Sequence, residues 1–284
     1  MVPCHQILTC DKILTTLYLR RHSSTAARAL PLTMTPSLAQ FSATRLRSFI
    51  SRLPLFTRAV FLIILLFWLL SIQPIWNVSQ WGALIPREIN LKSMYRINTF
   101  PLVHVGLFHA LSNVLALTPL LERFEAEHGT LTTLVLFFGP LSTIPALLYT
   151  FIETIILKMD TQILGASIWV FTLLAIEAMK TYKTYPHFML GSTPIPTWIS
   201  PLVMAIFVSV LIPNTSFLGH LCGLAFGYGW GLGYLKFLAP PERALRWIEG
   251  KLNLLGRLPH YVSIDQKTYG RFGVLPTTHQ KVAT

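Results

Sequence analysis

A serine and a histidine lie in two apolar segments that are roughly fifty residues apart in the chain. Ser167 follows Gly165-Ala166 at the start of one segment, and His220 follows Gly219 at the start of the other. An imidazole about 2.6–3.2 Å from a serine hydroxyl can take its proton and make the oxygen a nucleophile. A serine in an apolar helix often only bonds back to a carbonyl one turn earlier. An ionisable ring inside lipid is costly, however, so His220 makes the pair a candidate for nucleophilic catalysis.

Three further polar residues, His104, His109 and Asn113, lie together in a third apolar segment. His109 and Asn113 are four residues apart, so on a helix they share one face and can point at one atom. His104 lies five residues before His109, which rotates it away by more than a quarter turn at about 100° per residue. The spacing therefore separates His109 and Asn113, as a pair of donors, from His104.

The composition predicts that these segments cross a membrane. The chain has 284 residues, of which 52% are hydrophobic and 12% are charged, and its mean hydropathy is +0.55. Such a chain is too apolar for an ordinary soluble domain, and about 20 apolar residues are enough to cross a bilayer. We expect an all-α polytopic bundle of six transmembrane helices, at approximately 57–75, 100–120, 130–152, 162–180, 195–212 and 215–238.

The net charge of +12 indicates basic cytosolic flanks rather than a partner nucleic acid, because no zinc-finger or RNA-binding signature is present. With a cytosolic amino terminus, residues 34–58 place four Lys or Arg inside. The second-to-third and fourth-to-fifth connections add one and two, and the final tail adds eight, against four on the opposite side. This asymmetry predicts that both termini are cytosolic. The three cysteines form no disulfide framework.

This topology brings the polar residues into one layer, because the second, fourth and sixth segments all enter from the non-cytosolic side. Ser167 and His220 each lie about five residues into their segments, which is a similar, shallow depth at about 1.5 Å rise per residue. His104, His109 and Asn113 lie in the first turns of the second segment. Five polar side chains from three helices are therefore expected in the same half of the membrane.

Glycines indicate how these helices could touch. The sixth segment carries a glycine at every fourth position: Gly219, Gly223, Gly227 and Gly231. A ridge without side chains lets helix backbones come close together in lipid. We expect Gly165 and Ala166 to provide the matching small surface on the fourth segment.

The chain divides into a basic amino-terminal tail at 1–56, a helical core at 57–239 and a carboxy-terminal tail at 240–284. The arginines of the first tail are spaced among apolar residues. They fit either a mitochondrial targeting sequence or a cytosolic tail in which residues 1–33 precede the true initiator, Met34.

The carboxy-terminal tail begins with Pro240-Pro241 and then alternates apolar and basic residues at helical spacing as far as Arg257. This pattern predicts a short amphipathic helix on the cytosolic leaflet of the bilayer. We expect residues 260–284 to be polar and flexible. Within them, the glycine–aromatic patch 269–275 is a candidate docking peptide for a cytosolic partner.

Three short motifs resemble those of the rhomboid family of intramembrane serine proteases. They are Gly165-Ala166-Ser167, His104-x4-His109-x3-Asn113 and Gly219-His220-x2-Gly223-x3-Gly227. All three fall on the expected helices, and the resemblance covers about 57–238. The family implies a catalytic dyad without aspartate, in which Ser167 is the nucleophile and His220 the general base. It implies no metal and no other cofactor.

The resemblance also implies roles for the remaining motif residues. The oxyanion of the tetrahedral intermediate would be bound by His109, Asn113 and the backbone N–H of Ser167. His104 aligns with a histidine that has a structural role in the family. Structural roles are likewise implied for four glycines, Gly165, Gly219, Gly223 and Gly227.

Two departures bear on the substrate and the compartment. Tyr95-Arg96 stands where many rhomboids carry Trp-Arg, and the surrounding loop 76–99 is short. The core lacks the extra amino-terminal span of mitochondrial rhomboids. The chain therefore looks most like the fungal Golgi-type rhomboids, and the mitochondrial inner membrane fits less well. The implied substrates are single-pass transmembrane proteins in the lipid bilayer, including precursors of membrane-tethered transcription factors.

Two competing interpretations use the same apolar core. A catalytically inactive rhomboid-like protein that binds clients would lack the serine or the histidine, and this chain has both. A transporter would place paired charges at the midplane of the membrane. Glu153 and Glu177 lie near the ends of the expected spans instead.

Overall fold

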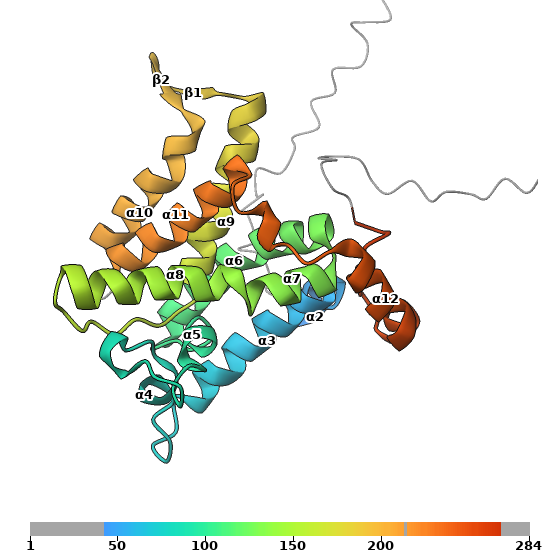
Figure 1. The fold of residues 1–284 in the computed structure, drawn as a ribbon, viewed down its shortest axis with the longest axis horizontal. Helices are drawn as coiled ribbons and strands as arrows, with labels where there is room; N and C mark the ends of the chain where they lie inside the picture. The colour runs from blue at the N-terminus through green and yellow to red at the C-terminus, as the bar shows by residue number, and fades with distance from the viewer. Residues whose placement is uncertain (1–42, 213–214, 268–284) are drawn as a thin grey trace, which may run out of the picture. The chain divides into compact units, whose positions relative to one another are not determined.

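The computed structural model describes residues 43–212 and 215–267, and most of them are helical (Figure 1). The α-helices are α2 (Ala43–Arg52), α3 (Leu55–Leu70), α4 (Val78–Gly82), α5 (Arg96–Thr99), α6 (Leu107–His128), α7 (Thr130–Phe137), α8 (Pro140–Phe151), α9 (Ser167–Thr184), α10 (Ser200–Leu211), α11 (Phe217–Leu232), α12 (Glu242–Leu252) and α13 (Leu254–Arg257). Residues 1–33, a targeting sequence or a segment before the true initiator, and the candidate docking segment 269–275 lie outside the described residues.

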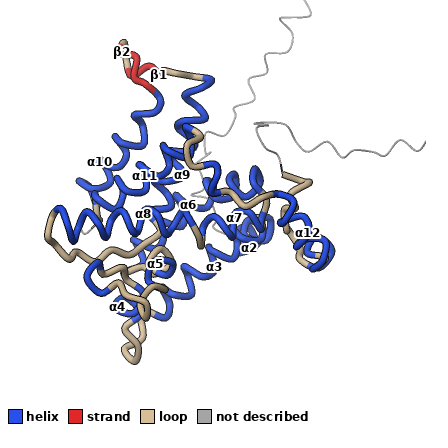
Figure 2. Tube along the Cα trace, viewed as in Figure 1, coloured by secondary structure: helices blue, strands red, loops and turns tan. Residues whose placement is uncertain are grey.

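Short elements complete the chain. They are the 3-10 turns η1 (Pro86–Glu88), η3 (Thr197–Ile199) and η4 (Lys236–Leu238), the π-helical turn η2 (Ile152–Ile156), and the antiparallel hairpin of β1 (His187–Leu190) and β2 (Thr193–Pro196). Figure 2 shows the long irregular segment around α4 and α5. The hairpin of β1 and β2 is the only sheet within the described residues, which agrees with the expected helical class.

Helix length shows only part of the expected set of six spans. Among the described residues, only Thr130–Ile156 has the length, 27 residues, and the apolar composition needed to cross a membrane. Leu55–Leu70 and Thr197–Leu211 are shorter apolar helices. α6 carries charged residues near its carboxyl end, and α11 has only 16 residues. For these reasons, α6 is not apolar enough along its length, and α11 is not long enough, to be identified as a membrane span from the helix alone.

Two of the expected spans begin later than their apolar runs. α6 begins at Leu107 rather than near residue 100, because the preceding Gly106 has a φ of +80° and interrupts a helical backbone. α9 begins at Ser167 rather than near residue 162. The residues before it are extended, since Ile163 exchanges two backbone hydrogen bonds with Leu84, at 2.9 and 3.0 Å. Ser167 is therefore the first residue of its helix and does not lie five residues inside it.

α9 and α11 pack backbone against backbone along the glycine ridge. A Cβ on Gly223 would lie 2.5 Å from the carbonyl oxygen of Ile168, and one on Gly227 would lie 2.3 Å from that of Thr172. The Thr172 hydroxyl also donates to the carbonyl of Gly223 at 3.1 Å. The ridge is therefore matched by one face of α9, and the expectation that Gly165 and Ala166 form the matching surface is wrong.

A buried carboxylate fixes the start of α3. Glu125 is fully buried, and its two oxygens accept hydrogen bonds from the backbone N–H groups of Phe56 and Thr57 at 2.9 and 2.8 Å. The hydroxyls of Thr57 and Thr130 donate to the same carboxylate. The first N–H groups of a helix have no hydrogen-bond acceptor within that helix. The carboxylate of Glu125, on α6, is the acceptor for these groups at the start of α3. The contact ties α3 to α6 at the end opposite the serine.

The carboxy-terminal tail is more ordered than expected. α12 and α13 form where an amphipathic helix was predicted, and the chain then continues as a packed segment to Lys267. Tyr261 and Ile264 are buried, and Thr130 donates its N–H to the carbonyl of Val262 at 2.8 Å. Glu249 accepts from the Tyr261 hydroxyl at 2.7 Å. The prediction that the chain is flexible from residue 260 is therefore wrong for 260–267. The contacts that order this segment come from Thr130 and Glu249, and the composition of the segment itself does not reveal them.

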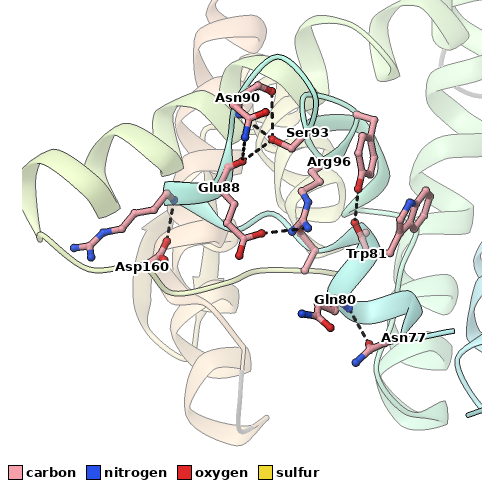
Figure 3. Close-up of polar contacts among 12 residues, drawn as sticks. Asn77, Gln80, Trp81, Glu88, Asn90, Ser93, Arg96 and Asp160 are labelled. Atoms are coloured by element: carbon pink, nitrogen blue, oxygen red, sulfur yellow. Dashed lines mark hydrogen bonds and ion pairs between the residues drawn. The ribbon is translucent and has the colours of Figure 1, made fainter.

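The loop 76–99 is structured and lies against the strand before α9. Its aromatic rings stack, with Trp81 5.8 Å from Phe67 and 5.4 Å from Tyr95 between ring centroids. Arg96 pairs with Glu88 at 3.2 Å and donates to the carbonyl of Ala83 at 3.2 Å (Figure 3). Both contacts hold the loop backbone next to Leu84, the residue that pairs with Ile163.

Candidate active site

Ser167 lies at the junction of an extended segment and a helix. It is the first residue of α9, and Ala166 is the N-cap. Gly165 has a φ of +106°, a backbone conformation that residues with a Cβ rarely adopt. The chain therefore turns sharply at Gly165 and presents a half-buried Ser167 at the helix start.

His104 holds this turn in place. Its Nε2 accepts a hydrogen bond from the N–H of Ala166 at 3.1 Å, so its hydrogen is assigned to Nδ1, which lies 3.3 Å from the carbonyl oxygen of Leu102. The ring is fully buried. Gly165 donates its own N–H to the carbonyl of Phe100 at 2.8 Å. The two consecutive N–H groups before the serine are thus fixed by the segment that leads into α6.

His109 and Asn113 lie in the first two turns of α6, beside the serine turn. The ring of His109 passes 2.8 Å from the position that a Cβ on Gly165 would occupy. Asn113 is buried, and its Nδ2 donates to the carbonyl of His109 at 3.0 Å. The amide nitrogen carries two hydrogens, so one remains for another acceptor. The structure therefore brings His109 against the serine turn and places Asn113 one turn further along.

His220 is the fourth residue of α11, and its ring is almost completely buried. It packs on the ring of Phe171, with centroids 4.3 Å apart. Nδ1 lies 3.3 Å from the hydroxyl of Ser209 on α10, and Nε2 has no partner among the described residues. In the tautomer with hydrogen on Nδ1, Nε2 has a free lone pair that can accept a hydroxyl proton.

Ser167 and His220 lie on packed helices, but no hydrogen bond joins their side chains within the described residues. The glycine contacts at Gly223 and Gly227 hold α11 directly on α9. In enzymes without bound substrate, catalytic hydrogen bonds are often long and close only in the complex. The geometry thus holds the two helices together and leaves both functional groups without a partner.

Backbone N–H groups at the start of α9 add hydrogen-bond donors to the candidate site. The carbonyl of Ala166 accepts from Trp169 and Val170, at 2.9 and 3.0 Å, whereas the N–H of Ser167 has no partner among the described residues. The first N–H groups of a helix point away from it, where the helix dipole favours negative charge. The N–H of Ser167 can therefore donate to an anion that forms beside its own side chain.

The extended segment 161–165 has one free edge. Backbone groups alternate in direction along a strand, so Ile163 and Gly165 face Leu84 and Phe100, and Gln162 and Leu164 face the other way. Neither Gln162 nor Leu164 has a backbone partner in the part of the chain that the structure describes. Unpaired N–H and C=O groups along a strand form a template for another extended chain.

The structure adds residues that the sequence analysis did not select. Phe171 lies four residues after Ser167, a spacing that places both on one helix face and could have been noticed. Ser209 is on a different helix from His220 and gives no signal in the sequence. Among residues 43–212 and 215–267, no group of three or more His, Cys, Asp or Glu side chains is placed to hold a metal ion.

Comparison with known proteins decides the family. Residues 91–237, more than half of the chain, match the Rhomboid domain. The chain belongs to the rhomboid family. It is 63% identical over 249 residues to Rhomboid-type serine protease B of Aspergillus fumigatus, which covers 88% of this chain and 91% of the relative. It is also 60% identical over 247 residues to Rhomboid-type serine protease 2 of Gibberella zeae, which covers 87% of this chain and 92% of the relative.

A third relative extends the same result. Rhomboid-type serine protease 2 of Neurospora crassa is 58% identical over 256 residues, with 89% of this chain and 92% of the relative covered. The chain is thus a rhomboid-type serine protease, an intramembrane enzyme that acts on membrane proteins.

Proposed function

We propose that this rhomboid protease cleaves the transmembrane segments of single-pass proteins with Ser167 as nucleophile and His220 as general base. The observation that carries the proposal is the unpartnered Nε2 of a buried His220, on a helix that packs directly on the helix of Ser167. A buried nitrogen without a partner is costly. A serine hydroxyl that turns toward it during reaction would satisfy it.

The reaction follows from these positions. His220 takes the hydroxyl proton as Ser167 attacks the substrate carbonyl, and then delivers this proton to the leaving amine. The carbonyl oxygen becomes an oxyanion beside the start of α9. It would receive hydrogen bonds from the N–H of Ser167, the remaining amide hydrogen of Asn113 and the ring of His109. Losing one such donor typically raises the barrier by about 3–4 kcal/mol.

Ser209 gives His220 a defined orientation in this scheme. A hydroxyl that accepts a hydrogen bond from Nδ1 keeps the hydrogen on that nitrogen and leaves Nε2 as the base. The aromatic ring of Phe171 limits rotation of the imidazole from one face. Positioning by a hydroxyl and a ring would replace the carboxylate that orients histidine in other serine proteases.

The substrate would enter as an extended chain along the free edge of Gln162 and Leu164. A transmembrane helix satisfies all of its own backbone groups, so it must unwind before its carbonyls can reach Ser167. The unpaired strand edge would compensate the unwound segment with new hydrogen bonds. This requirement favours substrates whose helices are easily frayed near the membrane surface at which Ser167 lies.

Orientation and location remain part of the proposal. We place six spans in the core at 57–239 and both termini in the cytosol, because Lys and Arg are concentrated on the flanks assigned to that side. The tail from 240 would lie on the cytosolic leaflet. A Golgi or other endomembrane compartment, with precursors of membrane-tethered transcription factors as substrates, is the biological setting that we propose.

Labelling with a serine-reactive fluorophosphonate separates this enzyme from an inactive client-binding protein. The full-length protein in detergent should label, and Ser167→Ala should not. Ser112→Ala is a matched control, because Ser112 also lies in a membrane helix near the site and only bonds back to the carbonyl of His109. Labelling that persists in Ser167→Ala, or cleavage activity that survives it, would refute the nucleophile assignment.

A further inference from the structure

A second buried polar group near the site is not used by the reaction described above. Glu153 is only 4% exposed, in the π-helical turn that ends the long helix Thr130–Ile156. No Lys or Arg pairs with its carboxylate among the described residues. A carboxylate buried at this depth is costly unless other groups bind it, and π turns inserted in helices are frequent at functional sites.

The partners of Glu153 lie on the strand that leads to the nucleophile. Its Oε2 lies 3.4 Å from the backbone nitrogen of Thr161, which donates to it. Tyr149, one turn earlier and fully buried, donates its hydroxyl to the carbonyl of Thr161 at 2.7 Å, and this hydroxyl lies 3.2 Å from Oε1 of Glu153. Both backbone groups of Thr161 are therefore held by side chains from one helix turn.

Thr161 is the first residue of the extended segment 161–165. The later residues of this segment are held by Leu84 at Ile163 and by Phe100 at Gly165. Before Thr161, the side chain of Asp160 accepts a hydrogen bond from the backbone N–H of Arg87 at 2.9 Å. The contacts at Thr161 are therefore those that fix the backbone groups directly before Gln162. The direction of the N–H and C=O groups of Gln162 depends on the backbone on both sides of it.

We propose that Tyr149 and Glu153 are positioning residues that align the edge of Gln162 and Leu164 for an extended substrate backbone. This inference rests on the proposed function, since it assigns a role in binding the same substrate. The pair acts on substrate alignment through Thr161 and has no part in activating Ser167, whose turn is fixed separately by His104 and Phe100.

This division of roles gives a measurement that a purely structural role would not move. A small fluorophosphonate reacts with Ser167 and has no backbone to place on the strand edge. A transmembrane substrate needs both the nucleophile and the edge. Loss of the contacts that Tyr149 and Glu153 make with Thr161 should therefore slow cleavage of the transmembrane substrate and leave the rate of fluorophosphonate labelling unchanged.

The experiment compares Tyr149→Phe, Glu153→Gln and the full-length wild type in proteoliposomes. Tyr149→Phe removes, at nearly constant shape, the hydroxyl that contacts the carbonyl of Thr161, the carboxylate of Glu153 and the side chain of Ser216. Glu153→Gln removes an acceptor without shortening the side chain. We expect kcat/KM for the transmembrane substrate to fall by about 3- to 10-fold in each variant. The rate of fluorophosphonate labelling should stay within about 2-fold.

Tyr228→Phe is the matched control. Tyr228 also donates its hydroxyl to a backbone carbonyl, that of Trp198, at 2.6 Å, but its partner is not on the strand. We expect this variant to cleave the substrate at the wild-type rate. Thermal unfolding of all three variants tests whether each is folded.

Three outcomes would overturn the proposal. Cleavage could be unchanged in both Tyr149→Phe and Glu153→Gln, labelling could slow as much as cleavage, or Tyr228→Phe could lose as much cleavage as Tyr149→Phe. Failure of the proposed function has a different signature, because the wild type itself would then not label at Ser167.

Discussion

Substitution of Gly227 by alanine tests whether the α9–α11 contact aligns Ser167 and His220, the two proposed catalytic residues. The added Cβ would lie 2.3 Å from the carbonyl oxygen of Thr172 and 2.7 Å from the Cβ of Ala175. Non-bonded heavy atoms prefer separations of about 3.5 Å, so the helices must move apart by about 1 Å. A carbonyl inside a helix cannot step aside, because it is fixed by the helical backbone.

The size of the effect follows from this displacement. Overpacking a tight contact destabilises a protein by about 1–3 kcal/mol. A shift of about 1 Å between reacting groups can reduce a rate by about 100-fold. We therefore expect Gly227→Ala to lose far more turnover per folded molecule than its change in stability explains.

The measurement combines cleavage of a transmembrane substrate, fluorophosphonate labelling and thermal unfolding in detergent. Gly231→Ala extends the test along the ridge, because its Cβ would lie 2.6 Å from the Cβ of Met179, an atom that the backbone of α9 holds in place, at a point further from Ser167 and His220. Gly250→Ala is a neutral control on α12, where nothing lies within 4 Å. It should keep full activity and gain up to about 1 kcal/mol of helix stability.

Wild-type labelling and cleavage by Gly227→Ala would refute this reasoning, since the backbone contact would then not set the distance between Ser167 and His220. Equal losses in Gly227→Ala and Gly250→Ala would refute it as well. They would show that the effect comes from glycine replacement in general.

Three further predictions concern other parts of the structure. Asn113→Ala should lower kcat by about 10- to 1000-fold with little change in KM, because an oxyanion donor acts only in the transition state; steady-state cleavage tests this, and an unchanged kcat excludes the role. Ser209→Ala should lower kcat by about 3- to 10-fold through the lost contact at Nδ1, and Ser209→Thr should restore it; a kcat equal to that of the wild type would contradict the assignment. Burial and the carboxylate of Glu249 raise the pKa of Tyr261 above its ordinary value near 10, so the contribution of its neutral form to stability should be lost as the pH rises above about 10. The difference in melting temperature between the wild type and Tyr261→Phe should therefore shrink between pH 9 and 11, and a constant difference would contradict the coupling.

The helices that carry the proposed site residues begin later than the sequence predicted. Hydropathy indicated a span from about residue 162, whereas α9 begins at Ser167. Apolar residues before the serine have the composition of a helix, but their backbone bonds to Leu84 and Phe100, which are more than sixty residues away. Local periodicity does not register such pairing, because a short apolar run such as 163–166 fits a buried strand equally well.

Contacts between distant segments account for the other differences. The glycine repeat in α11 correctly indicated a close helix contact, but the repeat does not specify its partner, which is the face of α9 that includes Ile168 and Thr172. The tail from residue 260 is polar in sequence, yet Tyr261 is buried because Glu249 and the start of α7 provide partners. Ser209 has no spacing relationship with His220, since the two meet only through packing of α10 on α11.

The polar side chains of the candidate site lie together because three helices begin close to them. α6, α9 and α11 begin within a few residues of His109, Ser167 and His220, respectively. Neither α6 nor α9 has a side-chain cap, whereas the Ser216 hydroxyl caps α11 by accepting a hydrogen bond from the N–H of Gly219. The uncapped ends direct free N–H groups and the positive ends of two helix dipoles into the layer.

This arrangement favours the charge that develops in the reaction. An oxyanion formed beside Ser167 would lie at the positive end of α9, next to the first turns of α6. In a low-dielectric layer, fixed dipoles stabilise such a charge without any reorganisation at the moment of reaction. The same dipoles oppose a long-lived imidazolium at His220, so transfer of its proton to the leaving amine is favoured. The proposed dyad without a carboxylate is consistent with this site, because helix ends would supply electrostatic stabilisation to the oxyanion and Ser209 would orient the base.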